Sequence, residues 1–268
     1  MPHAWPVWIA NSLADSGGWL GAEALLRALA ETGLSSQELA LAMLPEASAR
    51  AHAPVSGFAV GAVALVLGRD GREALALGAN FECVGASLSS TVHAEQAVTH
   101  LARSHGARRL LALALSADPC GHCRQFLLEV EGAEELCVLL ADGSSHQFSA
   151  LIPHSFQPSA LGRRPELLGA PREALRLRDG STDDLVRDAF EAARASYTPY
   201  SRAPAGVALC SVEGRIFTGS RLESVAFNPS LGAMSAALSS MAMAQASVAG
   251  FAPPVRAVLV ECVGLASE

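Results

Sequence analysis

Two short motifs constrain this chain more than any other feature, because their side chains must meet at one point. The first is His93-x-Glu95 and the second is Pro119-Cys120-x-x-Cys123. One imidazole and two thiols make a three-ligand zinc set, and a catalytic zinc keeps its fourth position for water. Glu95 is then left over, and a carboxylate beside a metal-bound water can carry protons to and from a substrate. We therefore expect one zinc ion per chain, held by His93, Cys120 and Cys123, with Glu95 as the catalytic acid–base group.

A structural zinc site or a redox pair is the alternative interpretation of the two cysteines. Structural zinc sites usually carry four protein ligands, typically in two pairs. The chain has no second Cys-x-x-Cys and no His-x-x-x-His. A thioredoxin-like pair stands alone, without a His-x-Glu upstream. Both motifs in this order, with Pro119 in place, favour the catalytic site.

Composition narrows the class of protein. The chain is 50% hydrophobic but only 5% aromatic, so its core should consist mostly of Ala, Leu and Val. Its net charge is −7 and no run of Lys or Arg exceeds two, whereas a nucleic-acid-binding surface needs clustered positive charge. No segment has about 18 uninterrupted apolar residues, and no basic segment precedes an apolar stretch with a cleavage site. We expect no nucleic-acid partner, no membrane span and no secretory signal.

Four cysteines lie outside the metal motif. Cys83, Cys137, Cys210 and Cys262 stand singly among apolar residues. Buried free thiols in a reducing compartment are typical of such a pattern. We expect the protein to be cytoplasmic.

Residues 1–44 are predicted to form a small helical N-terminal region. Residues 22–30 have leucines on one side, and Gly33 should end this helix. Ser35 and Glu38 form a capping box, which predicts a second helix directly after it.

Residues 45–150 are predicted to form the catalytic domain. The near-continuous apolar run at 58–67 fits a strand buried on both faces, and residues 75–80 should pair with it as a hairpin. A helix up to residue 106, a strand at 110–115, a helix from about residue 120 and a strand at 136–140 should follow. Strands that alternate with helices imply a layered α/β fold.

Both metal motifs fall at predicted helix N-termini. The helix dipole there lowers the pKa of a thiol, which helps Cys120 and Cys123 bind zinc as thiolates. Arg124, next to the second thiolate, either offsets some of the negative charge or faces solvent. His122 is expected to point away from the metal and to lie beside the site or on the surface.

Residues 151–180 contain four prolines, which predicts an interdomain linker. Whether Phe156 or another linker residue reaches a partner's site stays open.

Residues 181–268 repeat the catalytic domain. The segment 205–209 echoes 60–64, and 219–223 echoes 78–82. In that register His93 falls on Met234 and Glu95 on Ala236, and no Pro-Cys-x-x-Cys follows. We expect a degenerate copy that cannot bind zinc in the same way.

The chain resembles the long, dimeric cytidine deaminases over nearly its whole length. The His-x-Glu and Pro-Cys-x-x-Cys motifs are shared by zinc deaminases at large, whereas Asn80-x-Glu82 and the second copy narrow the resemblance to nucleoside enzymes. The resemblance implies a duplicated three-layer α/β/α cytidine deaminase-like fold with a mixed sheet, and a homodimer. The matching stretches are 58–62, 78–82, 91–96, 119–126 and 226–229.

The resemblance also implies a reaction and roles for residues. The reaction is hydrolytic deamination of cytidine and 2′-deoxycytidine to uridine and 2′-deoxyuridine, with release of ammonia, in pyrimidine salvage. Asn80 and Glu82 would bind the ribose, and Glu82 would accept a hydrogen bond from the 3′-hydroxyl. Phe58 would pack against the pyrimidine, and Ala94 would contact the substrate.

A homodimer implies a contribution from the partner subunit. The loop that contains Ala226 and Phe227 would reach the partner's nucleoside pocket.

One residue departs from the family pattern. Asp118 stands where the family usually has Ser or Thr, so either its backbone carbonyl alone is used or its side chain meets the amino group. Two other functions stay open: a deaminase of a modified nucleoside or nucleotide, and a zinc-stabilised nucleoside-binding protein without turnover. Glu95 argues against the second, because a purely structural site does not need it.

Overall fold

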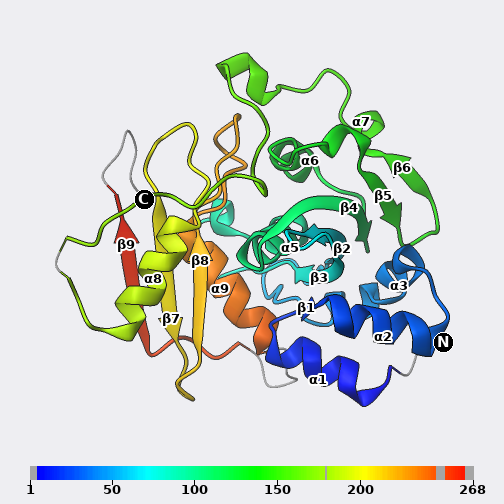
Figure 1. Ribbon diagram of the computed structural model, residues 1–268, viewed down its shortest axis with the longest axis horizontal. Helices are drawn as coiled ribbons and strands as arrows, with labels where there is room; N and C mark the ends of the chain where they lie inside the picture. Colours follow the sequence, from blue (N-terminus) through cyan, green and yellow to red (C-terminus); the bar gives the residue numbers. More distant parts are fainter. Residues whose placement is uncertain (1–4, 179, 246–250, 263–268) are drawn as a thin grey trace.

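The computed structural model describes residues 5–178, 180–245 and 251–262 of the chain, and these residues form two sheets with helices around them (Figure 1). The larger sheet has the strand order β1-β3-β2-β4-β5-β6, and the smaller one has the order β8-β7-β9. In the larger sheet β4 and β5 are parallel and all other neighbours are antiparallel. The predicted mixed sheet is confirmed. The strands of the larger sheet are β1 (Trp19–Leu20), β2 (Gly61–Gly68), β3 (Glu73–Ala79), β4 (Ala107–Leu115), β5 (Cys137–Leu140) and β6 (Ser145–Gln147).

The central strand β2 shows why the sheet is the middle of three layers. Its side chains alternate between the two faces. Ala62, Ala64 and Val66 belong to the hydrophobic core on one face. Val63 and Leu65 belong to the core on the other face. The continuous apolar run therefore marks a strand that is buried on both faces, as predicted.

The N-terminal residues supply one of the helical layers. Their buried leucines, for example Leu25 and Leu39, pack in the same core as Val63 and Leu65 of β2. The predicted capping box at Ser35 is present. The helices of this layer are α1 (Val7–Asp15), α2 (Ala22–Thr32), α3 (Ser36–Ala42) and α4 (Leu44–Ser48).

The opposite face of the sheet carries the metal motifs. Helix α5 (Ala94–Ser104) packs against β2 and β3, and helix α6 (Gly121–Leu127) packs against α5. After β6 the chain forms the short helix α7 (Phe148–Leu151) and enters the linker, which includes a 3₁₀ turn at Pro158–Leu161. The three-layer α/β/α arrangement is complete in this half.

The second half repeats this order in a smaller form. Helix α8 (Asp184–Arg194) precedes the hairpin of β7 (Ala205–Cys210) and β8 (Ile216–Ser220). Helix α9 (Ala233–Ala244) follows, and β9 (Arg256–Glu261) pairs antiparallel with β7, as β4 pairs with β2. The predicted duplication is confirmed at the level of topology.

A pair of hydrogen-bonded side chains also occurs in both copies. The Glu82 carboxylate accepts hydrogen bonds from the Ser56 hydroxyl and from the backbone N–H groups of Val55 and Ser56, at 2.5 to 3.0 Å. Glu223 accepts the same three bonds from the hydroxyl of Ser201 and from the N–H groups before and at that residue. We call this arrangement the Ser–Glu staple. It shows that the two loops share one backbone conformation.

The structure corrects the predicted register of the metal helix. Gly78 lies against Ala94 at the start of α5, and Gly219 lies against Ala233 at the start of α9; a Cβ on either glycine would come within 2.6 Å of that helix backbone. Ala94 follows Gly78 by 16 residues, whereas Ala233 follows Gly219 by only 14. The loop of the second copy is two residues shorter.

The counterparts of the metal residues therefore differ from those predicted. His93 corresponds to Gly232, because each is the N-cap of its helix, and Glu95 corresponds to Met234. The predicted counterparts, Met234 and Ala236, were wrong by two positions. The conclusion that this copy lacks the donors is unaffected.

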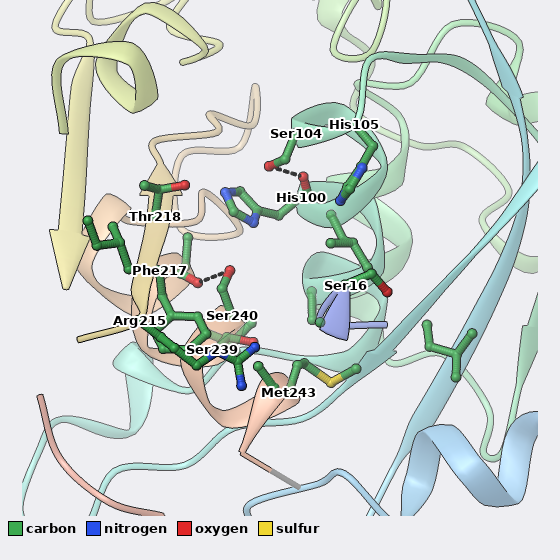
Figure 2. Close-up of a pocket in the computed structure, with 18 of the residues that line it drawn as sticks. Ser16, His100, Ser104, His105, Arg215, Phe217, Thr218, Ser239, Ser240 and Met243 are labelled. Carbon is green, nitrogen blue, oxygen red and sulfur yellow. Dashed lines mark hydrogen bonds between the residues drawn. The ribbon is translucent and has the colours of Figure 1, made fainter. Parts of the chain in front are cut away.

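The two copies are joined through buried polar contacts. His100 on α5 is buried, and its Nε2 accepts a hydrogen bond of 3.2 Å from the Ser220 N–H group. Beside this contact lies a cavity of about 250 Å³. Figure 2 shows His100 and Ser104 projecting from α5 on one side of this cavity, with Thr218 and Ser240 of the second copy on the other. It contains none of the predicted zinc ligands.

The structure also bears on the predictions about the four other cysteines and about membrane spans. Cys83 and Cys262 are exposed and Cys137 and Cys210 are only half-buried, so the prediction of buried thiols is wrong. Among the described residues no disulfide bond is formed. In the part of the chain that the structure describes, no helix is long and apolar enough to cross a membrane.

Candidate active site

The two metal motifs lie at the N-termini of adjacent helices. His93 is the N-cap of α5 and Cys120 is the N-cap of α6, and Cys123 lies in the first turn of α6. Both residues have extended backbone dihedrals. The structure therefore brings together the three residues predicted as ligands, from motifs about 30 residues apart, as expected for helix starts at one edge of the sheet.

The spacing of the three donor atoms fits a tetrahedral zinc ion. The Cys120 Sγ atom lies 3.5 Å from His93 Nδ1 and 3.6 Å from Cys123 Sγ. Zinc bonded to sulfur at about 2.3 Å and to nitrogen at about 2.0 Å requires separations of about 3.5 Å for nitrogen to sulfur and about 3.8 Å for sulfur to sulfur. The donor set and its geometry thus fit the metal that the motifs predicted.

The two thiols differ in their affinity for a proton. Hydrogen bonds from Cys123 and then His93 lower the pKa of Cys120 to about 3. The hydrogen bond to Cys120 and burial raise the pKa of Cys123. The pair thus holds one proton between two sulfurs, and a divalent metal replaces that proton on binding.

His122 lies closer to the site than expected. Its ring is 4.9 Å from that of His93, and its ligand nitrogen is within 4.8 Å of the other donors. The prediction that it points away was wrong, because Cys120 caps the helix and does not take part in its first turn. Its buried Nδ1 has no hydrogen-bond partner. Burial lowers the pKa of His122, so it stays neutral at neutral pH.

Glu95 lies in the first turn of α5 and is 4% exposed. Burial raises the pKa of its carboxyl group above the usual value, although a hydrogen bond with Cys123 acts in the opposite direction. A raised pKa brings a carboxyl group closer to the operating pH, where it can both accept and donate a proton. This is the protonation behaviour that an acid–base group requires.

A cavity of about 320 Å³ opens in front of the donor atoms. It is lined by the predicted zinc ligands His93 and Cys120, by Glu95, and by Asp118. The predicted substrate residues Phe58, Asn80, Glu82 and Ala94 also line it. Its volume lies at the lower end of the range for small-molecule sites.

The Asn80 side chain lines this cavity and bonds to the backbone of residues 58–60, where a neighbouring strand would otherwise pair. Its Oδ1 accepts a hydrogen bond from the Val60 N–H group at 2.8 Å, and its Nδ2 donates to the Phe58 carbonyl at 2.9 Å. The amide thus imitates a neighbouring strand, so β2 begins at Gly61 and not at Phe58 as predicted. Phe58 is left 61% exposed at the cavity rim.

Glu82 lines the cavity and is held by the Ser–Glu staple. Its bonds to Ser56 lower its pKa, although burial acts against them, so the carboxylate is charged at neutral pH. Sequence reasoning missed Ser56. The signal was available, because Ser201 and Glu223 repeat the same pair in the second copy.

Arg124 was predicted either to offset the negative charge of the thiolates or to face solvent, and its guanidinium bonds instead to two backbone carbonyls. It is half-buried, and its guanidinium donates to the Pro119 carbonyl at 2.7 Å and to the Leu151 carbonyl at 2.6 Å. It therefore braces the turn that carries Cys120. On the same helix, Gln125 Nε2 donates to the Phe156 carbonyl and fixes the start of the linker.

Gln96, on helix α5, connects this site to the second copy. Gln96 Oε1 accepts from the His93 N–H group at 3.1 Å, and its Nε2 donates to the Pro229 carbonyl at 2.9 Å. The loop 226–229 therefore contacts the start of α5 in its own chain. Phe227 in that loop is 61% exposed and has a φ of 61°. Ala226 beside it is exposed as well.

Glu129, just beyond the end of α6, is buried and was not predicted from the sequence. Its carboxylate accepts hydrogen bonds of 3.0 Å from the hydroxyls of Tyr197 and Tyr200, and one of 2.7 Å from the Val225 N–H group. All three donors belong to the second copy. Only the fold reveals this residue, since an isolated Glu after a helix is normally solvated.

Comparisons with known proteins find matches to both halves of the chain. Models described as the cytidine and deoxycytidylate deaminase zinc-binding region match residues 34–140 and residues 148–266. The fold and the donor set thus define a zinc-dependent deaminase. Together the two matches span well over half of the chain, and the chain belongs to the cytidine and deoxycytidylate deaminase family.

Individual relatives share most of the chain. The cytidine deaminase of Photobacterium profundum is 39% identical over 86% of this chain and 76% of its own length. That of Shewanella sediminis is 36% identical over 94% of this chain and 82% of its own length. Among solved structures, the cytidine deaminase from Mycobacterium tuberculosis is 38% identical over 46% of this chain and 98% of its own length, with a TM-score of 0.39.

Proposed function

We propose that this enzyme converts cytidine and 2′-deoxycytidine to uridine and 2′-deoxyuridine with release of ammonia, in pyrimidine salvage. The observation that carries the proposal is that Glu95 and the zinc donors line the same cavity as Asn80 and Glu82. His93, Cys120 and Cys123 would hold a zinc ion, which would supply an activated water for attack at C4 of the pyrimidine. His122 lies beside these donors, with its ligand nitrogen within 4.8 Å of theirs.

Glu95 is the group that transfers protons between the water and the substrate. It takes a proton from the attacking water and delivers it to N3 of the pyrimidine, which makes C4 electrophilic. It then takes the proton of the hydroxyl group now on C4 and passes it to the amino group, so that the C4 carbonyl forms, the C4–N bond breaks and ammonia leaves. One buried carboxyl with a raised pKa suits both directions of transfer.

The ribose is assigned to Asn80 and Glu82. Three hydrogen bonds already fix the Glu82 carboxylate, and it still has an acceptor position for the 3′-hydroxyl. A 3′-phosphate would meet this negative charge, so a free nucleoside is preferred to a polynucleotide. Phe58 packs on the pyrimidine from the cavity rim, and Ala94 contacts the substrate.

The proposed assembly is a homodimer. Residues 45–150 act as the catalytic domain with residues 1–44 as its helical layer, and residues 151–180 link them to the degenerate domain at 181–268. The exposed Phe227, held at a left-handed φ, supports a role for Ala226 and Phe227 in the partner's pocket. Such strain persists where the surroundings require it.

The same observations support a test of the dimer. Phe227→Ala should raise KM in the dimer, and mixed dimers that carry Phe227→Ala on one chain and Glu95→Gln on the other should show which chain completes a site. One fully normal site per mixed dimer is expected only if the loop serves the partner, because the chain with intact Glu95 then receives an intact Phe227. No fully normal site is expected if the loop serves its own chain.

The activity itself is tested with a nucleoside panel. Purified zinc-loaded protein should release ammonia from cytidine and 2′-deoxycytidine, and a Glu95→Gln variant should not. Release only from a modified nucleoside or from a nucleotide would replace the proposed substrate. Binding of cytidine without ammonia release would identify a binding protein instead. The proposed location is the cytoplasm, and it is supported by Cys83, Cys137 and Cys210, which form no disulfide among the described residues.

A further inference from the structure

A second polar cavity, of about 300 Å³, lies where the linker crosses the end of α5. Its wall comes from the β2–β3 turn, the end of α5, the linker and the residue after α8. Three arginines and one histidine line it, and among the residues that the structure describes no Asp or Glu does. The basic residues are Arg69, Arg103, Arg172 and His105. This gathering is unusual in a chain with a net charge of −7.

Arg103 forms the fixed part of the cavity wall. It is 9% exposed, and its guanidinium donates to the carbonyls of Ala195 at 2.6 Å, Ser196 at 3.0 Å and Leu167. Burial lowers its pKa to about 10, and the charges of Arg172 and Arg69 act in the same direction. The group stays cationic at neutral pH, so the cavity has a buried positive charge at a defined position.

The other two arginines are available to a ligand. The side chain of Arg69 is exposed, and it has no hydrogen bond or ion pair within the described part of the chain. Arg172 pairs with Glu191 at 3.1 Å, but both side chains are about half exposed. Exposed pairs of this kind are weak, so Glu191 does not neutralise the site.

Two features oppose an anion here, and neither places a carboxylate in the cavity wall. The C-terminal end of α5 carries a partial charge of about −0.5 from the helix dipole. Asp70 and Glu173 follow Arg69 and Arg172 in the sequence, but neither lines the cavity. Three full positive charges remain, and His105 stays neutral because burial lowers its pKa.

We propose that this cavity binds a phosphate group, either as inorganic phosphate or as a phosphate ester. Arginine matches the oxygen geometry of phosphate through paired N–H donors, and a doubly charged anion balances the converging cations better than a carboxylate does. The cavity volume leaves room for an ester substituent. The site is separate from the zinc cavity and does not depend on the proposed deamination.

The position of the site gives binding a structural effect. A bound phosphate would contact the catalytic hairpin through Arg69, helix α5 through Arg103 and the linker through Arg172. These segments hold the second copy against the first. Phosphate should therefore stabilise the folded two-copy arrangement in proportion to its occupancy.

The experiment measures phosphate binding to the intact zinc-loaded protein by calorimetry and by thermal unfolding. Sodium chloride keeps the ionic strength constant, and ribose 5-phosphate forms a second arm. The test variant is Arg69→Ala, and the matched control is Arg72→Ala. Arg72 loses the same charge from the same turn, but it faces Glu23 at 3.7 Å and does not line the cavity.

We expect saturable phosphate binding and a rise in Tm, with affinity at least tenfold weaker in Arg69→Ala and unchanged in Arg72→Ala. Basal turnover should be the same in both variants. Competition by ribose 5-phosphate would identify the ligand as a phosphate ester, and binding of inorganic phosphate alone would identify the free ion. No saturation beyond the chloride control, or equal weakening in both variants, would overturn the proposal.

Discussion

Glu129 provides the sharpest test of how the two copies are held together. The substitution Glu129→Ala removes the acceptor of two tyrosine hydroxyls and one backbone N–H group, all from the second copy. Tyr197 and Val225 are buried, whereas Tyr200 is half-buried and can bond to water instead. A buried donor left without a partner costs about 1–3 kcal/mol. Two such donors give an expected loss of about 2–6 kcal/mol.

The substitution Glu129→Gln should cost much less. Its amide oxygen can still accept from the Val225 N–H group, and its amide N–H groups can donate to the tyrosine hydroxyls, which are acceptors as well as donors. We expect a loss of about 1 kcal/mol, the value of one exchanged hydrogen bond. Glu131→Ala, on an exposed residue two positions later, serves as the control and should be neutral.

The comparison also has a pH signature. Burial raises the pKa of Glu129 above its ordinary value of 4.5. The folded state then binds the proton more tightly than the unfolded state, so this group makes the protein less stable as pH rises from about 4.5 through the folded pKa. Glu129→Gln lacks this dependence. Its stability relative to the original chain should therefore increase with pH across that window.

The assay is urea unfolding at saturating zinc, followed by circular dichroism at several pH values. The reasoning is refuted if Glu129→Ala lies within about 0.5 kcal/mol of the original protein, which is the usual range of surface substitutions. Equal losses in the Ala and Gln variants would refute the argument from hydrogen-bond exchange.

Further outcomes concern the active site itself. Glu95→Gln should keep zinc and fold but lose about 10²–10⁴-fold in kcat; near-normal turnover would contradict its role. Glu82→Ala should raise KM for cytidine far more than it alters binding of free cytosine, and equal effects on both would show that it does not read the ribose. Asp118→Ser should leave turnover unchanged if only the backbone carbonyl of this position is used. Elemental analysis should find one zinc per chain, and two would contradict the assignment of the second copy.

Much of the fold was predictable because its signals are local. The apolar run at 58–67 predicted a strand buried on both faces, which β2 forms from Gly61 onward, and Ser35 with Glu38 predicted the start of a helix. The zinc donors were equally clear, since few arrangements bring His93 near two cysteines. Residue type and spacing carry all of this information.

What the sequence could not provide depends on packing. The two-residue difference between the copies lies in a loop, and only the contact of Gly78 and Gly219 with their helices reveals it. Glu129 has no local signal, because its partners lie about 70 residues or more away in the chain. The position of His122 depended on whether Cys120 caps the helix or belongs to it.

The Ser–Glu staple has a consequence for how such an enzyme can change. The staple is present in the copy without metal donors, so its geometry does not require a metal. The part of the pocket that we propose for the sugar is therefore built independently of the zinc donors. Sequence drift around Ser56 can retune which sugars are accepted while the chemistry stays intact. In the second copy, which lacks the metal donors, the loop held by Ser201 and Glu223 keeps its conformation and could take on another function.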